Sequence, residues 1–168
     1  MKSIGIFYGS STGNTQDAAE RIAKKININQ SNLFDVGNVS VDKLQEYDVL
    51  FLGSSTWGMG DLQDDWEEFI LQLSKQDLSG KVVAVFGTGD SSSYSDTFCD
   101  ALGIIAQAAS KAGAKVVGSV DALAYSYDDS QSVKDGKFCG LALDTDNEND
   151  LTDGRINDWI EQIKLEIQ

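Results

Sequence analysis

The stretch SIGIFYGSSTGNT, residues 3–15, decides the fold. Its first half is short, apolar and rich in Ile and aromatic residues, which is typical of a buried strand. Its second half consists of Gly, Ser, Thr and Asn, and apolar residues then recur at helical spacing from Ala18 to Ile26. The stretch therefore predicts a strand, a turn rich in hydrogen-bond donors and an amphipathic helix.

The same alternation continues along the chain. Further apolar runs, each closed by Gly, Ser or Asp, predict strands, and helical periodicity fills most of the intervals. Strands that alternate with helices imply right-handed crossovers, a parallel sheet and helices on both faces, hence a single doubly wound α/β domain over residues 1–168. The predicted strands are residues 3–8, 32–36, 48–55, 81–89 and 114–120; the predicted helices contain residues 18–26, 44–47, 66–73, 98–109 and 156–167, the last with Thr152 as its N-cap.

One segment interrupts the alternation after Val120. The apolar run Phe138 to Leu143 indicates that the last strand resumes there. An unstructured loop of about twenty residues is unusual in a compact domain. We therefore expect an extra hairpin in this segment, formed by residues 122–127 and 137–138.

Composition limits the function classes. The net charge of −14, from 27 acidic and 13 basic residues, argues against nucleic acid and anionic membranes as partners and favours proteins with basic faces. The acidity serves either solubility or the steering of a cationic partner. No apolar run approaches the roughly 20 residues of a membrane span, and the first residues lack a signal-peptide pattern, so we expect a cytoplasmic protein.

The chain contains no His and two Cys, Cys99 and Cys139. Without His, the usual general base and metal ligand are missing, which makes Ser-His or Cys-His hydrolysis and most zinc chemistry unexpected. The cysteines have neither CxxC nor zinc spacing, so we expect both to be reduced and structural. We expect no metal site and no catalytic residue.

In open parallel sheets, ligands bind beyond the carboxyl ends of the strands. The first strand leads into GSSTGNT, in which Gly9 and Gly13 enclose three residues and Asn14 follows, so neither the Walker pattern nor GxGxxG fits. The loop contains no Lys or Arg. Neutral donors at a helix N-terminus can still bind one phosphate, although such residues also make an ordinary turn.

Two further strands lead into loops that each carry one large aromatic residue. Trp57 lies in SSTWGMGD, residues 54–61, and Tyr94 lies in GTGDSSSYSDTFCD, residues 87–100. Aromatic side chains in Gly- and Ser-rich loops at one end of a sheet are poorly placed for the core. They are well placed to sandwich a flat ring.

On these loops the chain resembles the flavodoxins, small FMN-containing electron carriers, over essentially its whole length. SSTGNT resembles their phosphate loop, residues 55–69 and 87–103 resemble their two isoalloxazine loops, and residues 140–150 resemble the segment that closes the last strand. The interrupted fifth strand resembles the long-chain subgroup. The resemblance implies a five-stranded parallel sheet in the order 2-1-3-4-5, with an insertion in the last strand.

The resemblance also implies the roles of individual residues. The FMN phosphate would lie on the loop's N–H groups, its hydroxyls and an Asn amide, while Trp57 and Tyr94 would stack on opposite faces of the ring. Asp146 would support the ribityl chain or the loop; the alternative is that Asp144 and Asp146 are both ordinary turn acids. The implied cofactor-binding residues are Ser10, Ser11, Thr12, Gly13, Asn14, Thr15, Ser55, Thr56, Trp57, Gly58, Thr88, Gly89, Asp90, Tyr94, Cys99 and Asp146.

The implied function is low-potential one-electron transfer between redox enzymes, through the semiquinone and hydroquinone forms of FMN. In flavodoxins a peptide at the position of Gly58 flips toward flavin N5, and acidic side chains near the ring disfavour the second electron; salt screening is the alternative for those acids. The implied partners of this monomer are a flavodoxin or ferredoxin reductase, a 2-oxoacid oxidoreductase or similar. The acids concerned are Asp61, Asp64, Asp65, Glu67, Glu68, Asp90, Asp96 and Asp100.

Three alternatives stay open. An FMN-dependent NAD(P)H:quinone reductase shares the fold, but no basic pocket for a dinucleotide phosphate is evident. A phosphoaspartate receiver domain needs an acidic pair after the first strand, where this chain has Gly9, Ser10 and Ser11. Cys99 near the ring is either redox-active or a buried structural thiol.

Overall fold

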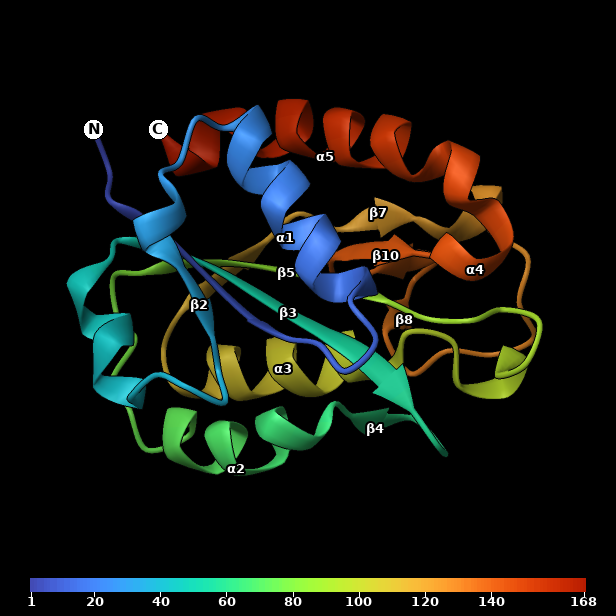
Figure 1. The fold of residues 1–168 in the computed structure, drawn as a ribbon, viewed down its shortest axis with the longest axis horizontal. Helices are drawn as coiled ribbons and strands as arrows, with labels where there is room; N and C mark the ends of the chain where they lie inside the picture. Colours follow the sequence, from blue (N-terminus) through green and yellow to red (C-terminus); the bar gives the residue numbers. More distant parts are fainter.

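The computed structural model describes residues 1–168 as a central parallel sheet with helices on both faces (Figure 1). The strand order is β10-β5-β3-β1-β2, with β6 also paired to β5. All of these pairings are parallel, and only the short β4 runs antiparallel, against the end of β3. The strands of this sheet are β1 Ile4–Gly9, β2 Leu33–Asp35, β3 Val49–Trp57, β4 Asp61–Leu62, β5 Val82–Thr88, β6 Lys115–Val117 and β10 Leu141–Leu143.

Two short strands share the fifth position of the sheet. β6 pairs with residues 82–84 of β5, and β10 pairs with residues 86–88 of the same strand. Counted by position, the order is 2-1-3-4-5, so the predicted topology with an interrupted last strand is confirmed. The predicted point of resumption is wrong, because β10 begins at Leu141 and Phe138 belongs to the insertion.

The helices form two layers, with α1 and α5 on one face of the sheet and α2 and α3 on the other (Figure 1). Each apolar period in the sequence corresponds to one of them, and a 3₁₀ helix, η2, leads into β3. No helix is both long and apolar enough to cross a bilayer. The helices are α1 Asn14–Lys25, α2 Asp64–Leu73, α3 Asp100–Lys111, α4 Thr145–Glu148 and α5 Thr152–Ile167; the 3₁₀ helices are η1 Gln30–Asn32, η2 Val41–Glu46, η3 Ser95–Thr97, η4 Ala122–Ala124 and η5 Asn149–Leu151.

The predicted N-cap of α5 is wrong. Thr152 is the first helical residue, its side chain is buried, and its hydroxyl has no hydrogen-bond partner. An N-cap residue needs extended backbone angles, whereas the chain reaches α5 already coiled through α4 and η5, with Leu151 at φ −92° and ψ −9°.

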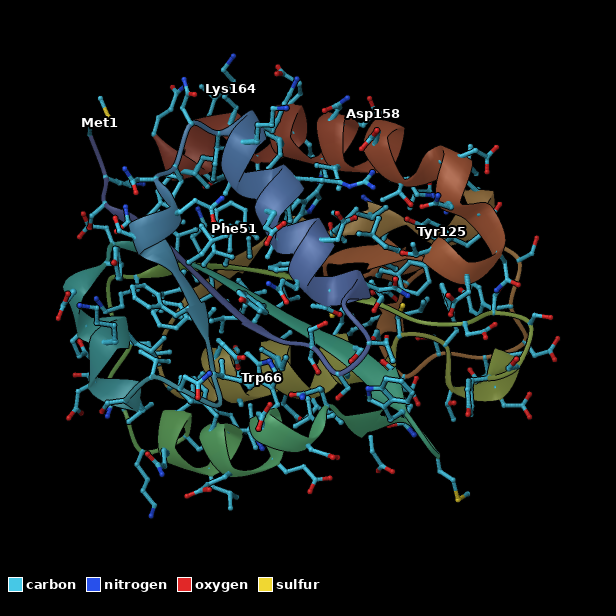
Figure 2. The ribbon with its side chains drawn as sticks, in the orientation of Figure 1. Met1, Phe51, Trp66, Tyr125, Asp158 and Lys164 are labelled. Atoms are coloured by element: carbon cyan, nitrogen blue, oxygen red, sulfur yellow. The ribbon has the colours of Figure 1, made fainter.

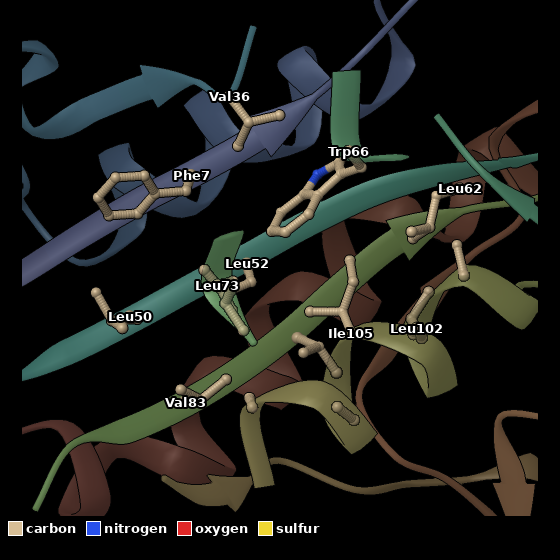
Figure 3. Close-up of a cluster of buried hydrophobic side chains, with 14 of the residues drawn as sticks. Phe7, Val36, Leu50, Leu52, Leu62, Trp66, Leu73, Val83, Leu102 and Ile105 are labelled. Atoms are coloured by element: carbon tan, nitrogen blue, oxygen red, sulfur yellow. The ribbon is translucent and has the colours of Figure 1, made fainter. Parts of the chain in front are cut away.

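The two faces of β3 supply the two halves of the core. Phe51 packs with α1 and α5, where Trp159 meets it edge to face at 5.6 Å between ring centroids. Leu50 and Leu52 point to the opposite face, toward α2 and α3 (Figure 3). There the Trp66 indole N–H donates to the Gly53 carbonyl over 2.7 Å, and Figure 2 places Phe51 and Trp66 on opposite sides of the sheet. This alternation follows from the two-residue period of a strand that is buried on both faces.

The insertion forms a small antiparallel sheet of its own. Its order is β7-β9-β8, and β8 and β9 are joined by Asp135 and Gly136, at φ 53° and 76°. Positive φ at both positions is the Asp-Gly hairpin signal, which could have located the hairpin from sequence. The expected strand at 137–138 is confirmed, but the expected partner at 122–127 is wrong, because Asp121 caps the 3₁₀ helix η4 there. The strands are β7 Val120–Asp121, β8 Val133–Lys134 and β9 Lys137–Phe138.

An aromatic cluster attaches the insertion to the main body. Phe138 is fully buried, and its ring lies 5.9 Å from that of Phe98, just before α3, and 4.9 Å from that of Tyr125. The Tyr125 hydroxyl donates to the Ala142 carbonyl in β10 over 2.7 Å. Phe138 fills this cluster and is therefore apolar. For that reason the apolar run in the sequence appeared to begin at Phe138, although β10 begins at Leu141.

Two glycines provide a matched test of the hairpin turn. An added Cβ would have no heavy atom within 4 Å at Gly136 or at Gly154, but only Gly136 has positive φ. We expect Gly136→Ala to lower the free energy of unfolding by about 1 kcal/mol through backbone strain. Gly154→Ala, in α5, should raise it by roughly 0.5–1 kcal/mol through helix propensity. Urea unfolding followed by circular dichroism measures both, and changes of the same sign would contradict the assigned turn.

Candidate functional site

The loops after β1, β3 and β5 emerge at the same edge of the sheet (Figure 1). They enclose a cleft there. Ten residues line the cleft, and two of them, Trp57 and Tyr94, are aromatic. Every residue that lines it belongs to the set proposed from the sequence, and none is basic. The lining residues are Thr12, Asn14, Ser55, Thr56, Trp57, Thr88, Gly89, Asp90, Tyr94 and Asp146.

One wall of the cleft is the turn between β1 and α1. Gly13, at φ 97°, precedes the helix and provides no side-chain cap. The backbone N–H of Gly13 donates to the Ser10 hydroxyl over 3.1 Å, whereas the N–H groups of residues 11, 12, 14 and 15 donate to no group within the chain. Unpaired N–H groups at the positive end of a helix dipole bind anions. The wall can therefore bind an anion through neutral donors.

The structure separates the roles of the loop's side chains. Thr12 is exposed and lines the cleft. Thr15 is fully buried, and its hydroxyl lies 3.0 Å from that of Thr88 in β5, so it ties the start of α1 to the neighbouring strand. The Asn14 amide donates to the Asp146 carboxylate over 3.4 Å. Thr12 is thus the loop hydroxyl that lines the cleft.

Trp57 ends β3 and forms a second wall. The side chain is half-buried, and its indole N–H donates to the Ser55 hydroxyl over 2.7 Å. A tight turn follows, in which the Gly60 N–H donates to the Trp57 carbonyl over 3.1 Å and Gly58 and Gly60 have φ of 53° and 92°. Glycine adopts such angles without strain, so both are needed for the chain to return as β4.

Tyr94 lies in the third loop, which is rich in Ser, and is 40% exposed. This loop is held by Asp90, whose carboxylate accepts hydrogen bonds from the Asn147 amide and from the backbone N–H groups of Ser92 and Ser93, at 2.9 to 3.0 Å. These bonds, the Asn147 contact first, lower the pKa of Asp90. The loop is therefore fixed by hydrogen bonds within it and by Asn147 of α4.

The two acidic candidates after β10 have different places. Asp144 is buried and accepts hydrogen bonds from the Ser91 N–H, the Ser91 hydroxyl and the Asn147 amide, the last over 2.8 Å. Asp146 is exposed and lines the cleft. Asp144 thus supports the third loop, and Asp146 faces the cleft. Asn147, which joins Asp90 to Asp144, was missed from sequence because one Asn carries no separable signal.

Some of the proposed residues lie outside the cleft lining: Ser10, Ser11, Gly13, Thr15, Gly58 and Cys99. Cys99 is fully buried at φ 54°, and burial raises the pKa of its thiol well above the usual value. Its backbone N–H donates to no group within the chain and lies behind Gly89, where an added Cβ would be 3.0 Å from the Cys99 nitrogen. Cys99 can therefore contribute to a ligand site through its backbone only.

Two side chains support the start of α3, and one of them, Asp100, corrects a sequence expectation. The Thr56 hydroxyl accepts the Ala101 N–H over 3.1 Å and so caps α3 from the end of β3. Asp100, expected among the surface acids, is buried and accepts the Gln131 N–H over 2.8 Å. Burial raises the pKa of Asp100. Asp100 therefore links the insertion to α3 and is not one of the exposed acids.

Comparisons with known proteins agree with this geometry. The family model for flavodoxin matches residues 6–159. A flavodoxin from Nostoc sp. is 45% identical over 165 residues, which cover 98% of this chain and 97% of the relative. A flavodoxin from Synechocystis sp. is 44% identical, covering 100% of this chain and 99% of the relative. The crystal structure of Fusobacterium nucleatum flavodoxin bound to flavin mononucleotide superimposes with a TM-score of 0.91 at 32% identity, covering 100% of each chain.

Thiol reactivity tests the placement of the cysteines. We expect Cys99 to resist iodoacetamide as long as the chain is folded, because only the exposed thiolate reacts. Cys139 is partly exposed, and burial raises the pKa of its thiol to about 11, so its alkylation should accelerate steadily from pH 8 toward pH 11. Peptide mass spectrometry measures both, with urea-unfolded protein as the control in which both react. Rapid alkylation of Cys99 in the folded protein at pH 8 would contradict its burial.

Proposed function

Since this chain belongs to the flavodoxin family, we propose that its cleft binds FMN non-covalently and that it carries single electrons between redox enzymes. Flavodoxins transfer electrons and have no substrate reaction of their own. The observation that carries the proposal is that one cleft combines two features: backbone N–H groups without partners at the start of α1, and two aromatic side chains. The first suits a terminal phosphate, and the second suits a flat ring.

The phosphate end of the cleft fits a dianion without a cation. Residues 11–15 offer four unpaired N–H groups, the α1 dipole and the Thr12 hydroxyl. Hydrogen bonds to a charged acceptor contribute about 1.5–3 kcal/mol each, roughly twice a neutral pair. Asn14, held by Asp146, would donate from the side. The residues present therefore fit the phosphate of FMN.

The ring end of the cleft fits isoalloxazine. Trp57 and Tyr94 would stack on its two faces, and an aromatic pair contributes about 0.5–1.5 kcal/mol beyond burial. Backbone groups of residues 88–90 and the unpaired N–H of Cys99 would meet its polar edge. When bound, FMN supplies the one-electron chemistry, and the protein's groups set its potential.

The charge around the ring end favours a low potential for the second electron. Asp61, Asp64 and Glu67 are exposed on β4 and α2, beside the loop that carries Trp57, and Asp90 and Asp146 line the cleft. Negative potential opposes the addition of a further negative charge to the ring. The proposed carrier is accordingly a strong reductant.

The same acids define the proposed partners. Redox proteins with basic docking faces, such as a flavodoxin or ferredoxin reductase or a 2-oxoacid oxidoreductase, would be steered to the cleft. Met59 is 90% exposed at its edge and offers an apolar contact there. We further infer that residues 1–168 act as one domain, because both helix layers pack on one sheet, and that this domain acts as a monomer. The two free cysteines suit the cytoplasm.

Thr12→Val tests the phosphate site. We expect the apoprotein to bind FMN about tenfold or more weakly after this change and riboflavin equally well, because only FMN loses a charged hydrogen bond. Thr152→Val is the matched control, since the Thr152 hydroxyl is buried without a partner and lies outside the cleft. Fluorescence titration of each apoprotein with both ligands measures the effect. An equal loss for FMN and riboflavin would contradict the assignment.

Gly58→Thr tests the ring loop. We propose that the Gly58 peptide rotates to offer its carbonyl to the reduced ring. A β-branched residue at φ 53° is strained and restricts this rotation. Loss of a net hydrogen bond of about 1 kcal/mol should lower the midpoint potential for the first electron by about 40–50 mV. Gly58→Asn is the control, because Asn tolerates positive φ. Unchanged potentials in a spectroelectrochemical titration of Gly58→Thr would refute this role.

A further inference from the structure

Gln63 is a buried polar residue behind the phosphate loop. It is 2% exposed and does not line the cleft. It lies between Leu62 and Trp66, which pack into the core on the α2 face of the sheet (Figure 3). Its backbone N–H donates to the Ser54 hydroxyl at the end of β3, over 3.1 Å. Gln63 thus stands where β3, α2 and the phosphate loop meet.

Hydrogen bonding fixes the orientation of the Gln63 amide. Oε1 accepts the backbone N–H of Asp65 over 3.0 Å and so caps α2. Because a backbone N–H can only donate, the oxygen must face it, and Nε2 must point the other way. Nε2 donates to the Asp65 carboxylate over 2.9 Å and to the Ser11 hydroxyl over 3.1 Å. Each polar atom of the side chain is therefore used.

We propose that Gln63 is a positioning residue that makes the Ser11 hydroxyl a donor to the phosphate. The Ser11 oxygen accepts from Nε2, so its proton cannot point toward Gln63 and is available on the other side. Ser11 donates no hydrogen bond within the chain, and its own N–H is unpaired. Both donors of Ser11 thus serve the anion site at the start of α1. The proposal rests on the proposed FMN function and adds a residue outside the cleft to it.

The amide is required for this role, because a carboxylate at position 63 would accept rather than donate. Ser11 would then turn its proton inward and present only lone pairs to the phosphate. The cap on α2 would survive, since a carboxylate oxygen also accepts the N–H of residue 65. The polarity of one side chain thus controls phosphate binding without changing the helix.

A charge-neutral swap tests the proposal. Gln63→Glu combined with Asp65→Asn keeps the net charge and the α2 cap. It also keeps the side-chain hydrogen bond between residues 63 and 65, with donor and acceptor exchanged. The main change is that the Ser11 hydroxyl faces a carboxylate acceptor in place of an amide donor. We expect the swap to weaken FMN binding by about tenfold or more and to leave riboflavin binding unchanged. Asp65→Asn alone is the matched control and should retain both affinities. Thermal unfolding of the apoproteins verifies that the swap folds.

A Ser11→Ala background separates a direct charge effect from an effect through Ser11. If Gln63 acts through Ser11, the swap should cost much less FMN affinity in Ser11→Ala than in the parent protein, as coupled residues do in a double-mutant cycle. The same penalty in both backgrounds, or equal losses for FMN and riboflavin, would overturn the proposal. Should the swap not fold, Gln63→Asn keeps the cap but is too short to reach Ser11, and unchanged FMN affinity in that variant would overturn the proposal equally. If the parent protein does not favour FMN over riboflavin, the proposed function itself fails.

Discussion

The parallel pairing of β3 with β1 and β5 is the constraint on which the site depends. Gly9 pairs with Ser54, and Ser55 pairs with Thr88, so the three loops that follow start at one level along the sheet. The pairing is strongly specified because β3 is buried between helices on both faces, and a slip of one residue would move Phe51 into the opposite half of the core. The cleft is therefore a consequence of strand register, which the apolar core determines.

The strands and loops could be predicted from sequence because each buried strand is an apolar run closed by small polar residues. Hydrogen bonds between side chains far apart in the sequence could not be predicted, because no local sequence pattern indicates the partner. Examples are Thr15 with Thr88 and Gln63 with Ser11. Asp100 looked like a surface acid because its burial depends on the insertion. Gly and aromatic positions in the site were accessible to sequence reasoning, whereas the buried polar residues that support them were not.

Those buried polar residues explain how loops rich in Ser and Gly can form a defined site. Gln63 holds Ser11, Thr56 caps α3, and Asp144 holds Ser91, so each loop is tied to a neighbouring element by a buried side chain. A loop already held in place loses less conformational entropy when a ligand binds. A buried polar group that is left without a hydrogen-bond partner costs free energy. These hydrogen bonds therefore also favour one arrangement of the loops over others.

The absence of Lys and Arg from the cleft lining has a consequence for the potential. A unit charge roughly 10 Å from the ring would interact with an added electron by about 0.4 kcal/mol at a dielectric constant of 80 and about 1.7 kcal/mol at 20. A cation in the phosphate loop would therefore make the ring easier to reduce and oppose the exposed acids around it. Backbone N–H groups, a hydroxyl and a helix dipole hold the anion at a smaller electrostatic cost, because partial charges act over a shorter range than a full one. A phosphate site of neutral donors would thus hold the cofactor without raising the potential of the ring.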